Sequence, residues 1–459
     1  MVNFIFLTVF LLSLVISGVC ILYLWFRFLP YPLLRVISVF FVGTLVSVPL
    51  LYGIACIVGK SQYPIGISLL VYGVIEGIVV FGIPKARKTF RSGLRSLYTD
   101  IRSVTWFEWL VFAITGIISF WIMGKSLKSV GDSVFVGSNE VFDFGHSLAI
   151  VRSFSWGNNF PFLSPFVAGQ IHLYHFMFYF LCGILEHFGL AIADAVNIPS
   201  ALFFCMFLLF TYYFPQQLFG RSRFMGLGMV FLVLTHSTLT FFLYFLNHGL
   251  SLASFKNIWT IPKYLYAAPF DGSPISIFWT LNVFTNQRHL AFGICGVLFL
   301  YYILSGNTGK HITGVVAFIL GIMVSFLASW HIVMWGICGF FGIYYFMRNR
   351  QYKNIIFFIF GSLFSIPFVY GWFMAIPKYL FAFAKSPIPQ SPANKISFYR
   401  LITVPILNVG VSILTVPVGF LLARSTIKKQ MIPFLFICIG LFLSLLIGQT
   451  GIAQKLLNI

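Results

Sequence analysis

Hydrophobic runs of about 18 residues or more recur along the whole chain, separated by short polar segments. A run of this length is what an α-helix needs to cross the hydrocarbon core of a bilayer. No long polar or low-complexity tract interrupts the series, so the pattern predicts an all-α, polytopic transmembrane bundle of about 12 to 13 spans. We interpret the first run, Phe4 to Phe26, as a retained span, because it lacks a basic region before it and a small-residue cleavage site after it.

The runs divide into two parts on either side of one basic connection. Residues 1–104 hold the N-terminal spans and this basic cytoplasmic loop. Residues 105–459 hold the larger transmembrane part, with outer loops near 125–170, 248–288 and 376–401. Because no polar linker separates the two parts, we expect one continuous membrane domain.

Basic residues predict the orientation. Six Lys and Arg residues share the connection at 85–104, and basic residues beside spans concentrate on the cytoplasmic side. The span Trp106 to Gly124 then crosses outward. The segment from Lys125 to about Ser147 is therefore expected on the extracytoplasmic side.

The next crossings raise a question of parity. Between the outer loop and a cytoplasmic Arg221 the chain crosses an odd number of times, yet two apolar runs are present, at about 171–188 and 196–214. We expect one of them, or the amphipathic piece 145–156, to be re-entrant or to lie in the interface. Later spans are expected at about 226–247, 289–306, 312–328, 330–347, 354–375, 402–423 and 431–449.

Composition agrees with this pattern and narrows the partners. The chain is 59% hydrophobic and 8% charged, with a mean hydropathy of +0.97, which excludes a water-soluble domain. The net charge of +20 does not indicate nucleic acid, because the basic residues stand at the ends of hydrophobic runs. Membrane lipids and lipid phosphates are the partners that fit. The seven cysteines are scattered singly and are expected to be small apolar core residues.

The expected outer loop is unusually acidic for this chain. Three of only nine acidic residues, Asp132, Glu140 and Asp143, fall within twelve residues. Helical spacing places Glu140, Asp143 and His146 together. One carboxylate can take a proton from a hydroxyl, while the second carboxylate or the histidine holds a divalent metal ion or orients the first carboxylate. The alternative is a solvated loop whose carboxylates cap the following helix or pair with Arg152.

Two further motifs stand at the outer ends of spans. After the Pro-rich stretch WGNNFPFLSPF, His172 and His175 are three residues apart and can face one cavity. TNQRHLAFG places Gln287, Arg288 and His289 at the mouth of another span, where Arg288 can bind a phosphate with two N–H groups. The alternatives are histidines that bond a carbonyl or water, and an arginine that only anchors a helix.

Other candidates for substrate binding are single residues. Arg152 and Asn158 follow the acidic group, and Lys263 and Arg400 lie in the two large outer loops, where positive charge calls for an anionic partner. Ordinary interfacial anchoring explains such residues equally well. His331, in a tight turn between two spans, either lines the same cavity or satisfies exposed backbone groups.

The acidic loop and the segment DFGHSLAIVRSFSWGNNFPFLSPFVAGQIHLYHF that begins in it, with QRHLAFG before a later span, resemble the GT-C superfamily of integral membrane glycosyltransferases. The likeness is to its protein-mannosyltransferase-like and poorly characterised bacterial branches, and its specific part covers about 40 residues. Here the acidic loop follows three N-terminal spans, whereas in many members it follows the first.

The resemblance implies a fold, a reaction and a place. It implies a GT-C-like bundle whose first outer loop contains interfacial helices and is catalytic. It implies transfer of a sugar from a polyprenyl-phosphate carrier to an acceptor at the extracytoplasmic face of the cytoplasmic (inner) membrane. A first-loop carboxylate serves as base or metal ligand, and by motif Asp143 is the first choice and Glu140 the second.

Two other classes of function remain open. A transporter or flippase of a lipid-linked or anionic substrate would carry charged residues at mid-span and show inverted repeats. A non-catalytic membrane scaffold, acting with a partner subunit, would bind no donor at all. The chain has no Walker loop, nucleotide-binding glycine pattern or serine elbow, so ATP-driven and serine-hydrolase chemistry have no support in the sequence.

Overall fold

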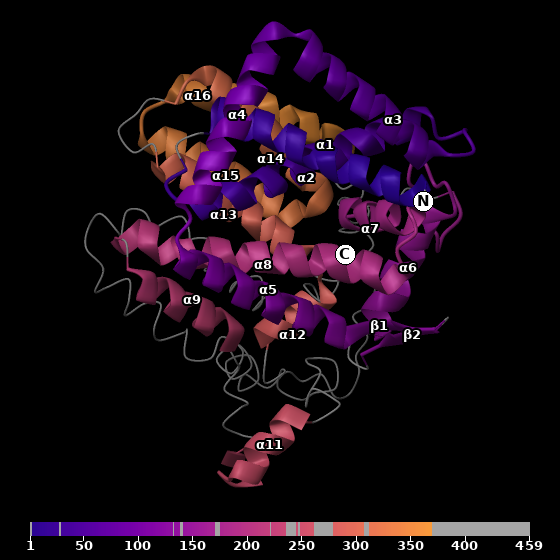
Figure 1. Cartoon of the computed structure of the whole chain (residues 1–459), viewed down its shortest axis with the longest axis vertical. Coiled ribbons are helices and arrows are strands. Elements are labelled where there is room, and N and C mark those ends of the chain that lie inside the picture. The colour runs from indigo at the N-terminus through magenta and orange to yellow at the C-terminus, as the bar shows by residue number, and fades with distance from the viewer. Residues whose placement is uncertain are drawn as a thin grey trace, which may run out of the picture.

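The computed structural model describes residues 2–26, 29–131, 133–137, 141–169, 175–220, 222–235, 245–246, 248–260, 279–306 and 312–369. About 82% of this part is helical, and six of its helices are long and apolar enough to cross a membrane (Figure 1). The protein is therefore an all-α, multi-pass membrane protein, as the hydrophobic pattern predicts. The predicted loop 376–401 and the predicted spans 402–423 and 431–449 lie outside the described residues.

The first half of the chain forms α1 (Val2–Trp25), α2 (Pro32–Ile57), α3 (Pro64–Gly77) with the π-helical turn η1 (Ile78–Gly82), α4 (Pro84–Ser103), α5 (Trp106–Ser126), β1 (Leu127–Val130), β2 (Ser133–Val136), α6 (Val141–Ser155), α7 (Met177–His187) and α8 (Ile192–Phe219). The second half forms α9 (Arg223–Thr235), α11 (Leu252–Thr260), α12 (Trp279–Asn286), α13 (Leu290–Gly306), α14 (Gly314–Trp330), α15 (Ile332–Arg348), α16 (Tyr352–Ser362) and the 3₁₀ turn η2 (Leu363–Ser365).

Glycines bring several helices into close contact. A Cβ atom on Gly18 of α1 would overlap the backbone of α2, and one on Gly43 of α2 would overlap that of α1. In the same way α14 and α16 meet at Gly321 and Gly361. Small residues at such crossings let the helix backbones approach each other closely. In a bilayer the hydrophobic effect does not hold helices together, because the lipid tails are equally apolar, so close packing contributes more.

Polar contacts fix which ends of the helices lie together. Asn197, near the start of α8, donates to the carbonyl of Leu127 at the end of α5 (2.8 Å). Near the opposite ends of these helices the Tyr213 hydroxyl donates to Glu108 (2.6 Å). Helices α5 and α8 are therefore antiparallel. We call the end that holds β1, β2 and α6 the site end, and the end that holds α4 and the start of α5 the basic end.

The segment after α5 departs from the sequence prediction. It opens with a two-stranded antiparallel hairpin, in which Leu127 pairs with Val136 and Gly131 turns the chain at a φ of 58°. We expected only interfacial helices there, because each strand is four residues long and too short to show a clear alternation. The expected helix follows as α6.

Helix α7 is the described helix within the apolar run predicted at about 171–188. This helix has 11 residues, so at about 1.5 Å per residue it is well short of the ~30 Å hydrocarbon core. Residues 177–186 are all buried among other helices. By contrast α8 has 28 residues and is long enough to span the membrane.

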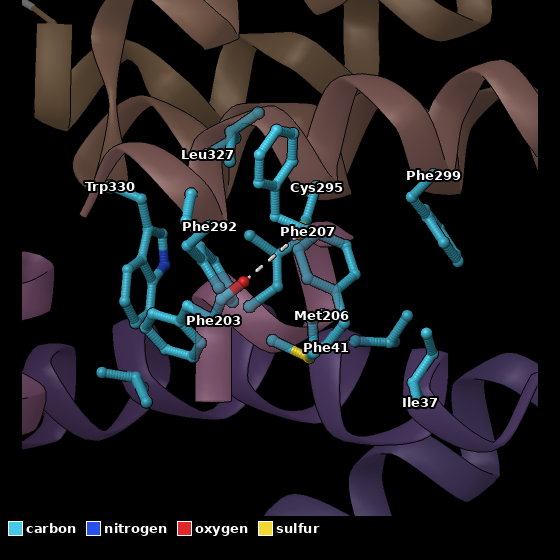
Figure 2. Packing of buried hydrophobic residues seen from close by; sticks show 14 of the residues in the cluster. Ile37, Phe41, Phe203, Met206, Phe207, Phe292, Cys295, Phe299, Leu327 and Trp330 are labelled. Carbon is cyan, nitrogen blue, oxygen red and sulfur yellow. Dashed lines mark hydrogen bonds between the residues drawn. The ribbon is translucent and has the colours of Figure 1, made fainter. Parts of the chain in front are cut away.

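The core is dominated by aromatic rings. Figure 2 shows Phe203 of α8, Phe292 of α13 and Trp330 of α14 packed together, with ring centroids 4.5 Å apart for Phe203 and Phe292 and 4.2 Å apart for Phe292 and Trp330. Helix α2 joins the same cluster through Phe41, 4.9 Å from Phe292. Residues from both parts of the sequence thus share one apolar core.

Candidate functional site

Asp143 stands in the first turn of α6, where a carboxylate is favoured by the helix dipole. Its side chain reaches the surface, but loss of hydration beside apolar atoms raises the pKa of the Asp143 carboxyl, and the nearby His146 opposes this effect. For His146, loss of hydration lowers the pKa and Asp143 raises it. The two groups expected to act together are therefore adjacent and electrostatically coupled.

Helix α6 is held in place by its apolar face. Phe144, Ile150, Val151 and Phe154 are buried, at the spacing of one face of a helix. Helix α7 packs closely at this face, because a Cβ atom on Gly183 would stand 2.9 Å from Phe154. Asp143 is thus carried by an element anchored in the core.

Tyr179 of α7 connects α6 with the interior. Its hydroxyl accepts a hydrogen bond from Ser147, one turn after Asp143 (3.0 Å), and it interacts electrostatically with Asp143. Its ring centroid lies 6.5 Å from that of His175 and 6.4 Å from that of His289. Tyr179 and Ser147 were not singled out in the sequence, although each lies four residues after a candidate.

Three histidines from separate parts of the chain meet at this point. His175 precedes α7, His289 precedes α13, and His331 separates α14 from α15. Their ring centroids are 3.4 Å apart for His175 and His289, 5.5 Å for His175 and His331, and 5.2 Å for His289 and His331. All three are buried. We call them the histidine cluster.

Burial favours the neutral form of His289 and His331. It lowers the pKa of His331 to about 4 and that of His289 well below its usual range, and His331 adds to the effect at His289. A neutral imidazole carries one N–H donor and one acceptor nitrogen. At His331, Nδ1 accepts from the backbone N–H of Met334 (3.5 Å) and caps α15. This bond leaves the proton on Nε2, so His331 can donate from that nitrogen.

Arg288 is a buried connector between helices. It is 3% exposed, and its guanidinium carbon lies 5.0 Å above the ring of Phe144. It donates hydrogen bonds to Thr285 O, Asn197 Oδ1, Met123 O and Ser126 Oγ. These bonds tie the α12–α13 turn to α5 and α8, and they hold His289 and the half-buried Gln287 beside α6 and α7.

The remaining described candidates lie at the edge of this region. Arg152 forms an ion pair with Glu186 (2.7 Å), which also accepts from Ser155 (2.6 Å). Arg152 is therefore engaged with α7. Asn158 has a φ of 46° and donates to the carbonyl of Gln62 (3.3 Å).

Four predicted site residues, Glu140, His172, Lys263 and Arg400, lie outside the described residues. In the described part Asp143 and His146 share α6, Tyr179 links this helix to the histidine cluster, and Arg288 contacts Phe144 of the same helix. A metal site commonly needs at least three protein ligands. Among the described residues no group of three His, Cys, Asp or Glu is arranged to hold a metal ion, and the tilted rings of His175 and His289, with centroids 3.4 Å apart, are too close to share one.

Comparison with protein-family models, with curated proteins and with solved structures finds no match for this chain.

An apolar crevice begins close to the histidine cluster. It lies between α2, α13, α14 and α15, and its lining includes Phe41, Phe299 and Leu327, which are drawn in Figure 2. Leu327 is one helical turn from the cluster, since its carbonyl accepts from the backbone N–H of His331 (2.8 Å). From α6 inward, the described region thus holds the Asp143 carboxylate, then the imidazoles of the histidine cluster, and then the apolar crevice.

Proposed function

We propose that this protein is a membrane glycosyltransferase of the GT-C type, which moves a sugar from a polyprenyl-phosphate carrier to an acceptor hydroxyl at the extracytoplasmic face of the inner membrane. The observation that carries the proposal is the convergence of Asp143 and the histidine cluster on Tyr179, beside an apolar crevice. A lipid-linked sugar phosphate presents the matching groups, which are a hydroxyl-rich ring, an anionic phosphate and an apolar tail.

Asp143 acts as the general base. The acceptor oxygen bonds to the anomeric carbon of the sugar while the bond from that carbon to the phosphate oxygen breaks. Asp143 takes the proton of the acceptor hydroxyl, and polyprenyl phosphate leaves with the bonding electrons. Its raised pKa suits this role, because a base works best when its pKa approaches the working pH. A single displacement inverts the anomeric configuration.

The histidine cluster supports the leaving phosphate. Neutral imidazoles donate hydrogen bonds without bringing a charge that would have to be desolvated. His331 donates from Nε2, since its other nitrogen accepts from the backbone. Arg288 acts as a positioning residue, because its hydrogen bonds to α5 and α8 fix the turn that carries His289. The tail of the donor lies among the apolar helices that surround the site.

The test is a transfer assay with purified protein and a panel of polyprenyl-phosphate sugars. Asp143→Asn is expected to slow transfer by about 10²- to 10⁴-fold, which is the usual contribution of a general base. Asp194→Asn is the matched control, because Asp194 is an exposed acid in the first turn of α8, at the same end of the bundle. Equal rates for wild type and Asp143→Asn would remove Asp143 from the mechanism.

One observation favours a flippase as the second candidate. Glu76 lies within the helical segment Pro64–Gly82, which is long and apolar enough to span a membrane, and it accepts a hydrogen bond from Ser17 of α1 (2.7 Å). The Tyr72 hydroxyl shares a hydrogen bond with Ser17 (2.7 Å) and donates to Ser47 of α2 (3.0 Å). A carboxylate within a span is a common feature of proton and substrate paths.

The two candidates separate in one pair of measurements. A flippase whose path includes Glu76 would lose movement of lipid-linked substrate across vesicles in Glu76→Gln and would show no bond cleavage. The glycosyltransferase keeps its transfer rate in Glu76→Gln, because Glu76 is held by α1 and α3 and makes no described contact with α6 or α7.

A further inference from the structure

Helix α4 has three chemically distinct faces. One face packs on α1: a Cβ atom on Gly93 would stand 2.8 Å from Val19, and Asp100 accepts a hydrogen bond from Tyr23 (2.6 Å). Asp100 also forms an ion pair with Arg35 of α2 (2.7 Å). This face holds the only acidic side chain of α4, and it is directed into the protein.

A second face is an exposed apolar stripe. Leu94, Tyr98 and Ile101 are spaced i, i+4 and i+7, so they lie in one row along the helix. They are 40%, 55% and 39% exposed. In the described structure this row is not covered by another helix, so it is available to a bilayer.

The third face is basic. Lys88, Arg91, Arg95 and Arg102 fall on one side of the helix, next to the apolar stripe, and all are exposed. Lys88, Arg91 and Arg95 form no ion pair with any described residue. The guanidinium of Arg102 lies 4.6 Å above the ring of Tyr98, where the basic face meets the stripe.

The helix runs crosswise to the bundle. In Figure 1, α5 and α8 lie nearly horizontal, whereas α4 descends steeply past the end of α1. Its two neighbours in sequence, α3 with η1 and α5, are both apolar enough to span a membrane. A helix that joins two spans in this direction lies near the plane of the interface.

We propose that α4 is a binding surface for anionic phospholipid. Its apolar stripe enters the acyl boundary, and its basic face binds the headgroup phosphates. The stripe favours a lipid surface over a soluble anion or a nucleic acid, because neither of these would need exposed Leu94 and Ile101. This proposal does not depend on the chemistry proposed for Asp143.

Binding is measured on the full chain in detergent by native mass spectrometry, with phosphatidylglycerol and phosphatidylcholine of identical acyl chains as probes. The wild-type protein is expected to bind phosphatidylglycerol more tightly than phosphatidylcholine. The triple variant Lys88→Gln, Arg91→Gln, Arg95→Gln is expected to lose about fivefold in affinity for each charge removed, from roughly 1 kcal/mol per basic residue. Its affinity for phosphatidylcholine is expected to stay unchanged.

The control removes the same charge elsewhere at the basic end, with Arg223→Gln, Arg350→Gln and Lys353→Gln, all exposed. An equal loss in this control would overturn the proposal, because the binding would then follow net charge alone. Glycerophosphoglycerol, the headgroup without acyl chains, separates a lipid from a free phosphate. If it binds as tightly as the whole lipid, the apolar stripe has no part and the proposal is wrong.

Discussion

Asp143 combines a charge with poor hydration, and this combination has a cost. Because the folded protein raises the pKa of this carboxyl, the native state binds its proton more tightly than the unfolded chain does. The stability gained from Asp143 is complete below the unfolded pKa and is lost as the pH rises through the raised, folded pKa. At neutral pH the ionised carboxylate is therefore a destabilising group.

This cost predicts opposite effects of one substitution on stability and activity. Asp143→Asn is expected to raise the Tm of the purified protein at about pH 8. The gain is expected to shrink as the pH falls toward about 3, where the Asp143 carboxyl is protonated in the folded and the unfolded state. Scanning calorimetry or tryptophan fluorescence in detergent measures the Tm at each pH. In the control Asp194→Asn, loss of a negative charge from a helix N-terminus leaves Tm equal or lower. A Tm drop for Asp143→Asn at both pH values would show that its carboxylate is structural.

Arg288 is the residue whose removal should damage the fold most. It donates to groups on α5 and α8 from a buried position, so Arg288→Ala leaves several buried acceptors without a donor. We expect a loss of about 3 kcal/mol or more, since bonds from a charged donor contribute ~1.5 to 3 kcal/mol each. Arg288→Lys is expected to restore little of this stability, because one ammonium group cannot make the several directed hydrogen bonds of a planar guanidinium.

The measurement is Tm in detergent, with Arg95→Ala as control. Arg95 is an exposed residue of α4, and surface substitutions of this kind change stability by about 0.5 kcal/mol or less. If Arg288→Ala keeps the wild-type Tm but no longer binds lipid-linked donor, the arginine contacts substrate instead of positioning His289.

At the scale of elements, the crossing of α14 and α16 is a sharp test of packing. A Cβ atom on Gly321 would overlap the carbonyl oxygen of Phe358, and one on Gly361 would overlap that of Phe318. Gly321→Ala and Gly361→Ala are each expected to cost about 1 to 3 kcal/mol, because the helices must move apart. Gly339→Ala on α15 meets no atom within 4 Å and is expected to stabilise by up to about 1 kcal/mol. Equal Tm shifts at all three sites would contradict a close crossing.

The positions of several membrane helices could be predicted from the sequence, whereas the short strands and the helical form of the basic connection could not. The runs predicted at 289–306, 312–328 and 330–347 correspond to α13, α14 and α15 within a few residues, because a long apolar run has few alternatives in a bilayer. The hairpin β1–β2 was missed, since four-residue strands carry almost no periodic signal. The sequence predicts a basic loop at 85–104, whereas the structure has the helix α4 there.

In the candidate site, too, local features could be predicted from the sequence and long-range contacts could not. The spacing of Asp143 and His146 on one helix was predictable, because it depends on local geometry alone. The meeting of His175 with His289 and His331 was not, because it depends on how α7, α13 and α15 pack. No pattern in a single sequence measures the separation of residues more than 100 positions apart.

For the whole molecule, orientation in the membrane is the property most open to test. Ser133→Cys places an exposed thiol in the hairpin, and Ser92→Cys places one on α4. A membrane-impermeant maleimide applied to intact spheroplasts is expected to label the first and not the second until the cells are opened. The six described cysteines contribute little background, because they are buried or half-buried. Labelling of both positions from outside would reject the predicted topology.

The central claim is that a lipid-linked sugar binds where α6, α7, α13 and α15 meet. A polyprenyl-phosphate sugar with a photoreactive diazirine on the sugar ring tests it directly, with the crosslinked peptides identified by mass spectrometry. We expect crosslinks within Val141–Ser155 and around His175 and His331, competed away by unlabelled donor. Crosslinks confined to α1 and α3 around Glu76, or spread evenly over lipid-facing helices, would contradict it.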